Sequence, residues 1–143
     1  MRTRIPKEQV EHLGKVPLFS SCTQSELRHI AQLGTPVEAE EGAVLTQQGK
    51  PGREFFLVLD GVASCRVASK EVKRFRAGGY FGELALLHGG VRTADVVAVT
   101  PMDLVVFDAR EFRTLLTTTP SIAVKMLANL AERLTDADAQ YTH

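Results

Sequence analysis

The chain has 143 residues, of which 44% are hydrophobic and 24% are charged. These values are typical of one globular domain and exclude intrinsic disorder as the main state. The 17 lysines and arginines balance the 17 aspartates and glutamates, and this net charge of zero argues against a protein that mainly binds the phosphate backbone of nucleic acids.

The sequence offers no signal for a membrane or for secretion. No run of roughly 18 apolar residues occurs, so no segment is expected to insert into a membrane. Residues 1–8 lack the apolar stretch of a secretory signal peptide, which predicts a cytoplasmic location. The two cysteines, Cys22 and Cys65, have no metal-binding spacing and are interpreted as buried, reduced thiols. A disulfide between them is the alternative, if the fold brings them together.

Residues 1–35 predict an N-terminal helical segment. Residues 6–15 are weakly helical. Thr23 and Glu26 then form a capping box, in which each side chain accepts a hydrogen bond from the other residue's backbone N–H. Apolar residues follow at helical spacing, which predicts a helix over residues 24–33. Gly34 is expected to end that helix as its C′ residue.

Residues 36–107 have the shorter period of β-strands. Strand-like runs occupy residues 44–46, 55–59, 62–67, 72–75, 93–99 and 104–107. Turn residues separate these runs at intervals of roughly 8–12 residues, which is typical of a β-sandwich or barrel. Asp60-Gly61, between two of the runs, predicts a hairpin turn.

Helices return at residue 108. Asp108 with Glu111 has the pattern of a second capping box, and Thr119-Pro120 has the pattern of an N-cap followed by a first helical proline. An apolar stripe then runs from Ala123 to Leu134. Residues 135–143 are polar and are expected to fray, so the predicted C-terminal helices end at residue 134.

Residues 79–94 differ from ordinary strand-and-turn sequence. The glycines before residue 83 permit a tight exit from a strand, residues 83–87 form one or two helical turns, and Gly89-Gly90 end them. The free N–H groups at the start of such a turn, together with the positive end of the helix dipole, predict an anion-binding site.

Two charged residues narrow the choice of anion. Arg92 returns near the start of the helical turn, and its guanidinium can contact two oxygens of one phosphate. Glu83 would repel a multiply charged phosphate but suits a hydroxyl donor beside the phosphate. A ribose 2′-hydroxyl next to a cyclic 3′,5′-phosphodiester meets both requirements, and the sequence has no GxxxxGK[ST] loop for a triphosphate. A structural salt bridge at Arg92, without any ligand, is the alternative interpretation.

The sequence Phe81-Gly82-Glu83-Leu84-Ala85-Leu86-Leu87, followed by Arg92-Thr93-Ala94, resembles the phosphate-binding cassette of the cyclic nucleotide-binding domain family. This is the family of the catabolite activator protein and the regulatory subunits of protein kinase A. The resemblance covers nearly the whole chain. It implies an α+β fold: an eight-stranded antiparallel β-roll, jelly-roll-like (a double-stranded β-helix), flanked by N-terminal helices and two C-terminal helices.

The implied organisation is a single domain over residues 1–143. It comprises the helical segment 1–35, the β-roll 36–107 with its cassette at 81–94, and the C-terminal helices 108–134. Two positions depart from the family pattern: Arg53 follows Gly52 where many members have an acid, and Val91 precedes Arg92 where many have proline.

The resemblance also implies which residues bind the ligand. They are Phe81, Gly82, Glu83, Leu84, Ala85, Arg92, Thr93 and Ala94. In this assignment Glu83 holds the ribose 2′-hydroxyl and Arg92 the cyclic phosphate. Backbone N–H groups near Leu84 and Ala85 and at Ala94 complete the phosphate cradle. The Thr93 hydroxyl could accept a hydrogen bond from the 2-amino group of guanine, and cAMP and cGMP both remain open as ligands.

The expected function is a sensor domain that binds cAMP or cGMP and whose C-terminal helices respond to the ligand. We expect no catalysis and no cofactor besides this ligand. No metal is expected, because the four histidines include no His-x-His pair. The expected partners are the cyclic nucleotide and either an effector protein or a second copy through the C-terminal helix, with no nucleic acid and no membrane insertion. The alternatives are the N-terminal effector domain of a catabolite-activator-type transcription regulator without its DNA-binding part, and a ligand-free dimerisation module.

Overall fold

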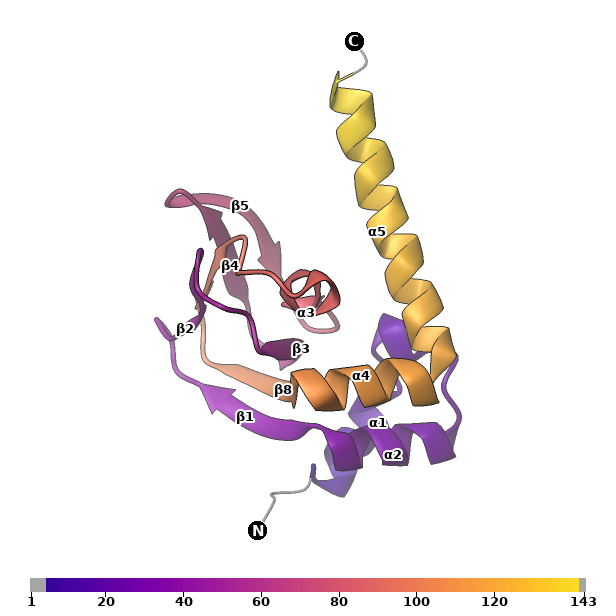
Figure 1. Ribbon diagram of the computed structural model, residues 1–143. Helices are drawn as coiled ribbons and strands as arrows, with labels where there is room; N and C mark the ends of the chain where they lie inside the picture. Colours follow the sequence, from indigo (N-terminus) through magenta and orange to yellow (C-terminus); the bar gives the residue numbers. More distant parts are fainter. Residues whose placement is uncertain (1–4, 142–143) are drawn as a thin grey trace.

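The computed structural model describes residues 5–141, apart from the side chains of residues 7, 8 and 137–141. Within this range helices lie at both ends of the chain and strands lie between them (Figure 1). The helices are α1 (Lys7–Leu13), the short 3-10 helix η1 (Pro17–Phe19), α2 (Gln24–Leu33), α3 (Glu83–His88), α4 (Ala109–Thr118) and α5 (Pro120–Tyr141). The strands are β1 (Thr35–Ala39), β2 (Val44–Thr46), β3 (Glu54–Asp60), β4 (Ala63–Val67), β5 (Lys70–Phe75), β6 (Tyr80–Phe81), β7 (Asp95–Ala98) and β8 (Met102–Asp108).

The strands of the described range form two antiparallel sheets. One 4-stranded sheet has the order β1-β8-β3-β6, and the other has the order β2-β7-β4-β5. The eight strands with helices at both ends confirm the predicted antiparallel β-roll. Helix α3 lies within the strand region, between β6 and β7 in the chain.

Strand β3 is covered on both faces. Phe55, Leu57 and Leu59 belong to a hydrophobic cluster that also contains residues of the N-terminal helices, α4 and α5. Phe56 and Val58 belong to a second cluster with residues of β4, β6 and β7. Because alternate side chains enter different clusters, the strand is a continuous apolar run rather than an alternating one.

The predicted hairpin at Asp60-Gly61 is wrong. Strand β3 pairs with β6 and β8, whereas β4 pairs with β5 and β7, so this turn carries the chain from one sheet to the other. Gly61 has a φ of +95°, and a Cβ there would lie 2.4 Å from the carbonyl oxygen of Pro101. A glycine is therefore needed for a tight crossing between sheets, which has the same local sequence as a hairpin turn.

The N-terminal capping box is confirmed, but the role of Gly34 is different from the one predicted. Thr23 Oγ1 accepts a hydrogen bond from Glu26 N–H, and Glu26 Oε1 accepts one from Thr23 N–H. Gly34 has an extended backbone, with φ −81° and ψ 162°, rather than the left-handed conformation of a C′ glycine. A Cβ at Gly34 would lie 2.4 Å from Val105 Cγ1, so close packing against β8 excludes a side chain there.

The β4–β5 hairpin contains a β-bulge that decides which side chains face the interior of the roll. Cys65 pairs with Lys73 and Arg66 pairs with Glu71, which leaves Val72 as the extra residue of β5. Without this bulge, strict alternation would place Glu71 on the same face as Lys73. With it, Glu71 lies on the opposite face from Cys65.

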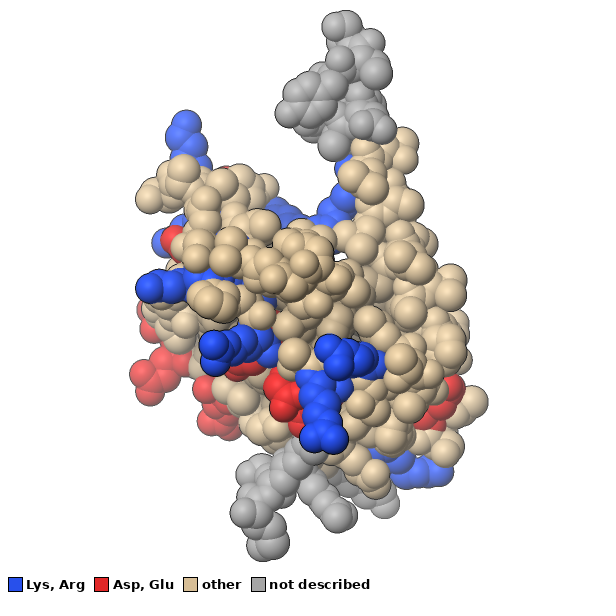
Figure 2. Space-filling model, viewed as in Figure 1, with Lys and Arg blue, Asp and Glu red and all other residues tan. Residues whose placement is uncertain are grey.

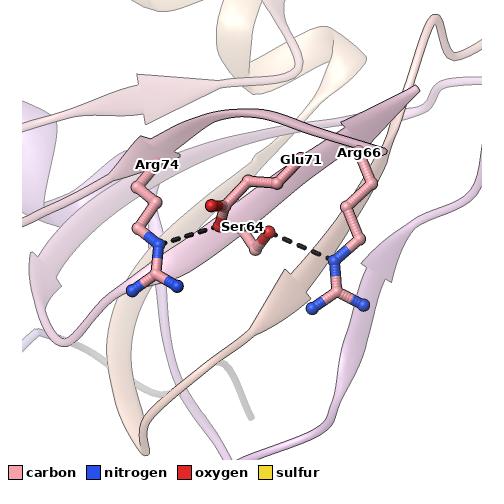
Figure 3. Close-up of polar contacts among 4 residues, drawn as sticks. All are labelled: Ser64, Arg66, Glu71 and Arg74. Carbon is pink, nitrogen blue, oxygen red and sulfur yellow. Dashed lines mark hydrogen bonds and ion pairs between the residues drawn. The ribbon is translucent and has the colours of Figure 1, made fainter. Parts of the chain in front are cut away.

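A polar network holds the hairpin from that outer face (Figure 3). The buried Ser64 hydroxyl donates to Glu71 Oε1 at 2.7 Å, and Arg74 Nε donates to the same oxygen at 2.8 Å. Arg66 Nε donates to the Ser64 hydroxyl at 3.1 Å. Hydrogen bonds from Ser64 and Arg74 lower the pKa of Glu71 below its usual value. These contacts link both strands and keep β5 in its bulged register.

The C-terminal helices begin as predicted but continue further. Asp108 and Glu111 form the predicted capping box at the start of α4. Helix α5 begins at Pro120 and continues to Tyr141, beyond the predicted end at residue 134. No glycine or proline follows Leu134 to end the helix, and the Thr135 hydroxyl donates to the carbonyl oxygen of Ala131, one turn back. The predicted end of the C-terminal helices at residue 134 is therefore wrong, and residues 142–143 of the stretch expected to fray lie outside the described residues.

The described part of the chain shows mixed charges on one face and two free cysteines. On the face shown in Figure 2, lysine and arginine side chains are spread among acidic and neutral ones, in keeping with the zero net charge. Cys65 is buried and Cys22 is partly buried, and neither forms a disulfide. Burial raises the pKa of both thiols. None of the helices within residues 5–141 is both long enough and apolar enough to span a bilayer.

Candidate functional site

A cavity of about 240 Å³ lies inside the open side of the β-roll and is called here the cassette cavity. Its walls come from strands of the second sheet, from β6 and α3, from the loop before β7, and from α5. The lining residues are Thr46, Cys65, Val67, Val72, Lys73, Phe75, Phe81, Gly82, Glu83, Leu84, Ala85, Arg92, Thr93, Ala94, Val96 and Arg133. Segments far apart in the sequence thus converge on a volume suited to one small ligand.

Gly82 determines how the chain enters α3. It is the residue before the helix and has a φ of +94°, which favours glycine. A Cβ at Gly82 would lie 2.7 Å from the carbonyl oxygen of Glu54 and 2.8 Å from Arg92 Nη1. The absence of a side chain therefore lets the start of α3, β3 and the Arg92 guanidinium come together.

Arg92 is held by backbone carbonyls rather than by an acid. Only 7% of the residue is exposed. Its Nη1 donates to the carbonyl oxygen of Gly82 at 3.0 Å, and its Nη2 donates to that of Glu54 at 2.6 Å. Among the side chains that the structure describes, no carboxylate lies within ion-pair distance of it. The salt-bridge interpretation of Arg92 thus finds no partner within the described part of the chain.

The described surroundings of Arg92 compensate its positive charge only in part. Burial lowers the pKa of Arg92, and the more distant charges of Glu54 and Glu83 only partly oppose this effect. Buried charges in proteins are normally paired or bonded to a ligand. A guanidinium that is fixed in place and still has unused N–H groups is suited to an anion.

Glu83 is the second buried charged group of the cavity. The residue is 4% exposed, and its Oε1 accepts a hydrogen bond from Arg133 Nη2 at 3.0 Å. Its other oxygen, Oε2, is buried without a hydrogen-bond partner among the described residues. An unpartnered buried carboxylate oxygen is costly, and a ligand hydroxyl could satisfy it.

Every residue predicted to bind the ligand lines the cassette cavity. This applies to Phe81, Gly82, Glu83, Leu84, Ala85, Arg92, Thr93 and Ala94, although their individual roles stay predictions. One local detail was wrong: the predicted strand run began at residue 93, whereas β7 begins at Asp95, so Thr93 and Ala94 precede the strand.

Other lining residues were not found from the sequence. Phe75 is partly buried, packs against the second hydrophobic cluster and lines the cavity. Lys73 and Val72 depend on the β-bulge, which no local pattern predicts. Arg133 lies 50 positions from Glu83, on a helix whose polar face gives no sign of this contact. Only a prediction of where α5 packs could have found it.

A larger cavity of about 490 Å³ adjoins the first and shares Lys73, Phe75, Glu83 and Arg133 with it. Its remaining walls come mainly from η1, the turn before β6, and α5. In it Asn129 Nδ2 donates to the Tyr80 hydroxyl at 2.8 Å. Lys125 donates to the carbonyl oxygen of Pro17 at 3.2 Å and also contacts the Ser20 hydroxyl. These contacts fix α5 against the roll near the cassette cavity.

The described residues contain no cluster of three or more histidine, cysteine or acidic side chains that could hold a metal ion. Arg92 and Glu83 together suit a small ligand that carries one negative charge beside a hydroxyl group.

Comparison with known proteins agrees with this geometry. The profile of the cyclic nucleotide-binding domain matches residues 36–119, which is more than half of the chain. This chain belongs to the cyclic nucleotide-binding domain family. The predicted family is thereby confirmed.

Among known members of the cyclic nucleotide-binding domain family, the cAMP-dependent protein kinase regulatory subunit of Schizosaccharomyces pombe is 38% identical over 105 residues, which is 73% of this chain and 26% of that protein. The chain thus spans about a quarter of the length of the curated relatives that it matches.

Two solved structures have the same fold. A protein kinase A regulatory domain bound to Sp-2Cl-cAMPS superposes with a TM-score of 0.79 at 26% identity, covering 92% of this chain and 90% of that one. The Thermus thermophilus catabolite activator protein gives a TM-score of 0.80 at 27% identity, covering 87% of this chain and 61% of that one. Both proteins share their fold with this chain. The ligand Sp-2Cl-cAMPS and the name catabolite activator protein describe those two proteins.

Proposed function

We propose that this domain is a non-catalytic sensor that binds cAMP or cGMP in the cassette cavity and passes the bound state on through α5. One observation carries the proposal. Among the described residues, a buried guanidinium without an ion-pair partner and a buried carboxylate with one unpartnered oxygen line the same cavity of about 240 Å³. A cyclic nucleotide offers one group to each: the cyclic phosphate to Arg92 and the ribose 2′-hydroxyl to Glu83.

The charge of the ligand follows from having both groups in one cavity. Arg92 attracts the phosphate, and the nearby Glu83 carboxylate would repel a second or third negative charge. A cyclic phosphodiester carries only one negative charge, whereas a nucleoside diphosphate or triphosphate carries more. The pair therefore favours a cyclic nucleotide over ATP or GTP.

Arg133 supports the role of α5 in the response. Its guanidinium donates to Glu83 Oε1, so the C-terminal helix contacts the carboxylate that the ribose would contact. If the affinity of the ligand for Glu83 differs between a close and a displaced position of α5, binding shifts the equilibrium between these two positions. Because Val124, Leu127 and Leu134 on the exposed side of α5 are each more than 60% exposed, a partner protein or a second copy could detect that movement.

A second candidate is the effector part of a transcription regulator of the catabolite activator type. The likeness to the Thermus thermophilus protein over 87% of this chain favours it. Both candidates share the binding of a cyclic nucleotide, and in both we expect the chain tested here to leave duplex DNA unbound. A gel-shift assay with tight binding of duplex DNA by this chain would contradict that expectation.

The test is a calorimetric titration of the purified chain with cAMP, cGMP and 2′-deoxy-cAMP. The wild type should bind cAMP or cGMP, and loss of the 2′-hydroxyl should weaken binding by about tenfold or more, since a hydrogen bond to a charged group contributes about 1.5–3 kcal/mol. In Glu83→Gln the gap between cAMP and 2′-deoxy-cAMP should shrink, because the charged acceptor is gone.

The matched control is Glu132→Gln, which removes an exposed carboxylate from α5 near the larger cavity. It should keep the wild-type gap between cAMP and 2′-deoxy-cAMP. Absence of binding to either cyclic nucleotide at millimolar concentration would refute the sensor function. Binding with an unchanged gap in Glu83→Gln would refute the ribose role of Glu83.

A further inference from the structure

Thr46 and Asp95 are polar residues next to the cassette that neither the sequence motif nor the proposed function uses. Thr46 is 6% exposed and lines the cassette cavity, whereas Asp95 is partly buried and does not line it. We propose that both are positioning residues, whose side chains hold the loop of residues 92–94 where it can bind the cyclic phosphate. The inference rests on the proposed function, because it concerns the anion-binding loop of the same cavity.

The loop of residues 92–94 depends on bonds from elsewhere in the fold. Strand β7 begins only at Asp95, so these three residues lie outside the strands of both sheets. Irregular backbone of this kind keeps one shape only where other groups satisfy its polar atoms. The groups that do so come from the end of β2 and the residues after it, 46–50, which we call the support segment.

The support segment bonds to the backbone of Arg92 on both sides. Gly49 N–H donates to the carbonyl oxygen of Arg92 at 2.9 Å, and Arg92 N–H donates to that of Lys50 at 2.8 Å. These two bonds fix the main chain from which the guanidinium extends, while the carbonyls of Gly82 and Glu54 fix its far end. Arg92 is therefore held at both ends of its side chain.

Two side-chain hydrogen bonds fasten the end of the loop. The Thr46 hydroxyl donates to the carbonyl oxygen of Ala94 at 3.0 Å. Asp95 Oδ1 accepts from the backbone N–H of Gln48 at 2.7 Å. Gln48 Oε1 in turn accepts from Ala68 N–H at 3.2 Å, so the same chain of hydrogen bonds reaches the turn between β4 and β5.

These contacts order the loop before a ligand arrives. A loop that is already ordered loses less conformational entropy on binding than one that the ligand must order. Loss of one of these hydrogen bonds should therefore weaken binding, even though the lost group did not contact the phosphate. The net contribution of a neutral hydrogen bond corresponds to about two- to tenfold in an equilibrium constant, and we expect a loss of affinity in that range.

The first experiment removes and restores the Thr46 hydroxyl. Thr46→Val has nearly the same shape but no donor, and Thr46→Ser restores the donor. Calorimetry measures the dissociation constants of cAMP, 2′-deoxy-cAMP and the Rp and Sp isomers of cAMP phosphorothioate, and thermal unfolding measures stability. Thr35→Val is the matched control, because it removes a hydroxyl from a strand of the other sheet, at a residue that does not line the cassette cavity.

The two phosphorothioates report the geometry of the phosphate site. Each isomer replaces a different exocyclic oxygen of the phosphate by sulfur, which is a weaker hydrogen-bond acceptor. A loop that is held in one place should bind the two isomers with different affinities, whereas a loop that can shift should adapt to either. A general loss of stability would leave the ratio of the two affinities unchanged.

In Thr46→Val, the affinity for cAMP should fall by about two- to tenfold, and the ratio of the Rp and Sp affinities should move toward one. The gap between cAMP and 2′-deoxy-cAMP should stay as in the wild type, since Glu83 makes the ribose contact. Thr46→Ser and Thr35→Val should keep the wild-type affinity and ratio. An unchanged ratio in Thr46→Val, or a wild type that binds both isomers equally, overturns the role of Thr46.

The second experiment separates position from charge at Asp95. Asp95→Asn keeps an oxygen acceptor for Gln48 N–H but removes the negative charge, whereas Asp95→Ala removes both. If Asp95 positions the loop, Asp95→Ala should bind cAMP several-fold more weakly than Asp95→Asn. If Asp95 acted only through its charge, the two variants would bind cAMP equally well, and that result overturns its positioning role. A wild type that binds no cyclic nucleotide overturns the proposed function and this inference together.

Discussion

Replacement of Arg92 by lysine separates the charge of this residue from its geometry. The structure fixes the guanidinium before any ligand arrives, because Nη1 and Nη2 donate to the carbonyl oxygens of Gly82 and Glu54 at 3.0 and 2.6 Å. A lysine keeps the positive charge but has a single compact ammonium. It cannot hold both carbonyls and still present a planar set of donors to a phosphate.

The magnitude follows from the contacts. Arg92→Ala removes a charge-assisted contact to the phosphate of about 1.5–3 kcal/mol, which weakens binding by roughly 10- to 150-fold. Arg92→Lys should weaken binding by about tenfold, because the lysine side chain must be ordered when the ligand binds and cannot make the bidentate contact. In Arg92→Ala, loss of the two carbonyl contacts is offset by removal of the buried charge, so we expect the free energy of unfolding of this variant to change by less than about 2 kcal/mol.

Calorimetric titration with cAMP and cGMP, together with thermal unfolding followed by circular dichroism, measures both quantities. Arg53→Ala is the control, since Arg53 is exposed and does not line the cassette cavity. Its affinity should equal that of the wild type. If Arg92→Lys binds within twofold of the wild type, a point charge is sufficient and the argument from a fixed guanidinium is wrong. If Arg92→Ala also does so, Arg92 does not bind the phosphate.

Three further predictions concern the supports of the site. Gly82→Ala should lower the free energy of unfolding by about 1–3 kcal/mol more than Gly49→Ala. Both glycines have positive φ, but only at Gly82 would a Cβ meet other atoms. Equal losses of stability in denaturant unfolding would contradict this argument. Arg133→Ala should speed dissociation of the cyclic nucleotide several-fold in stopped-flow measurements. The loss of stability should be small, since the ion pair between Arg133 and Glu83 is half exposed on the arginine side. The control Arg28→Ala, at an exposed residue, should leave the dissociation rate unchanged. The lowered pKa of Glu71 adds stability that is present above its unfolded-state pKa and is lost as the pH falls through the folded-state value. Acid unfolding of Glu71→Gln should therefore have a smaller dependence on pH in that range, and an identical pH profile would show that the Ser64 and Arg74 contacts do not stabilise the charged form.

The local features of this protein follow from its sequence. Both capping boxes, at Thr23 and Asp108, are correct because their hydrogen bonds join residues only three positions apart. The cassette over residues 81–94 is likewise a nearly continuous segment, and its glycines, helical turn and arginine indicated one anion-binding place. Since residues 81–85 and 92–94 of this segment line one cavity, a short stretch of chain carries most of the polar chemistry of the site.

The tertiary structure decided what depends on distant partners. The period of a strand does not tell which sheet it joins, so Asp60-Gly61 was predicted as a hairpin when it connects two sheets. The bulge that turns Lys73 inward depends on pairing between β4 and β5, and the contact of Arg133 with Glu83 depends on how α5 packs against the roll. The sequence by itself therefore determined the cassette side of the cavity, because its predicted site residues all lie within residues 81–94. Only the packed fold decided the wall that β4, β5 and α5 form, because its residues meet through strand register and helix packing rather than through spacing along the chain.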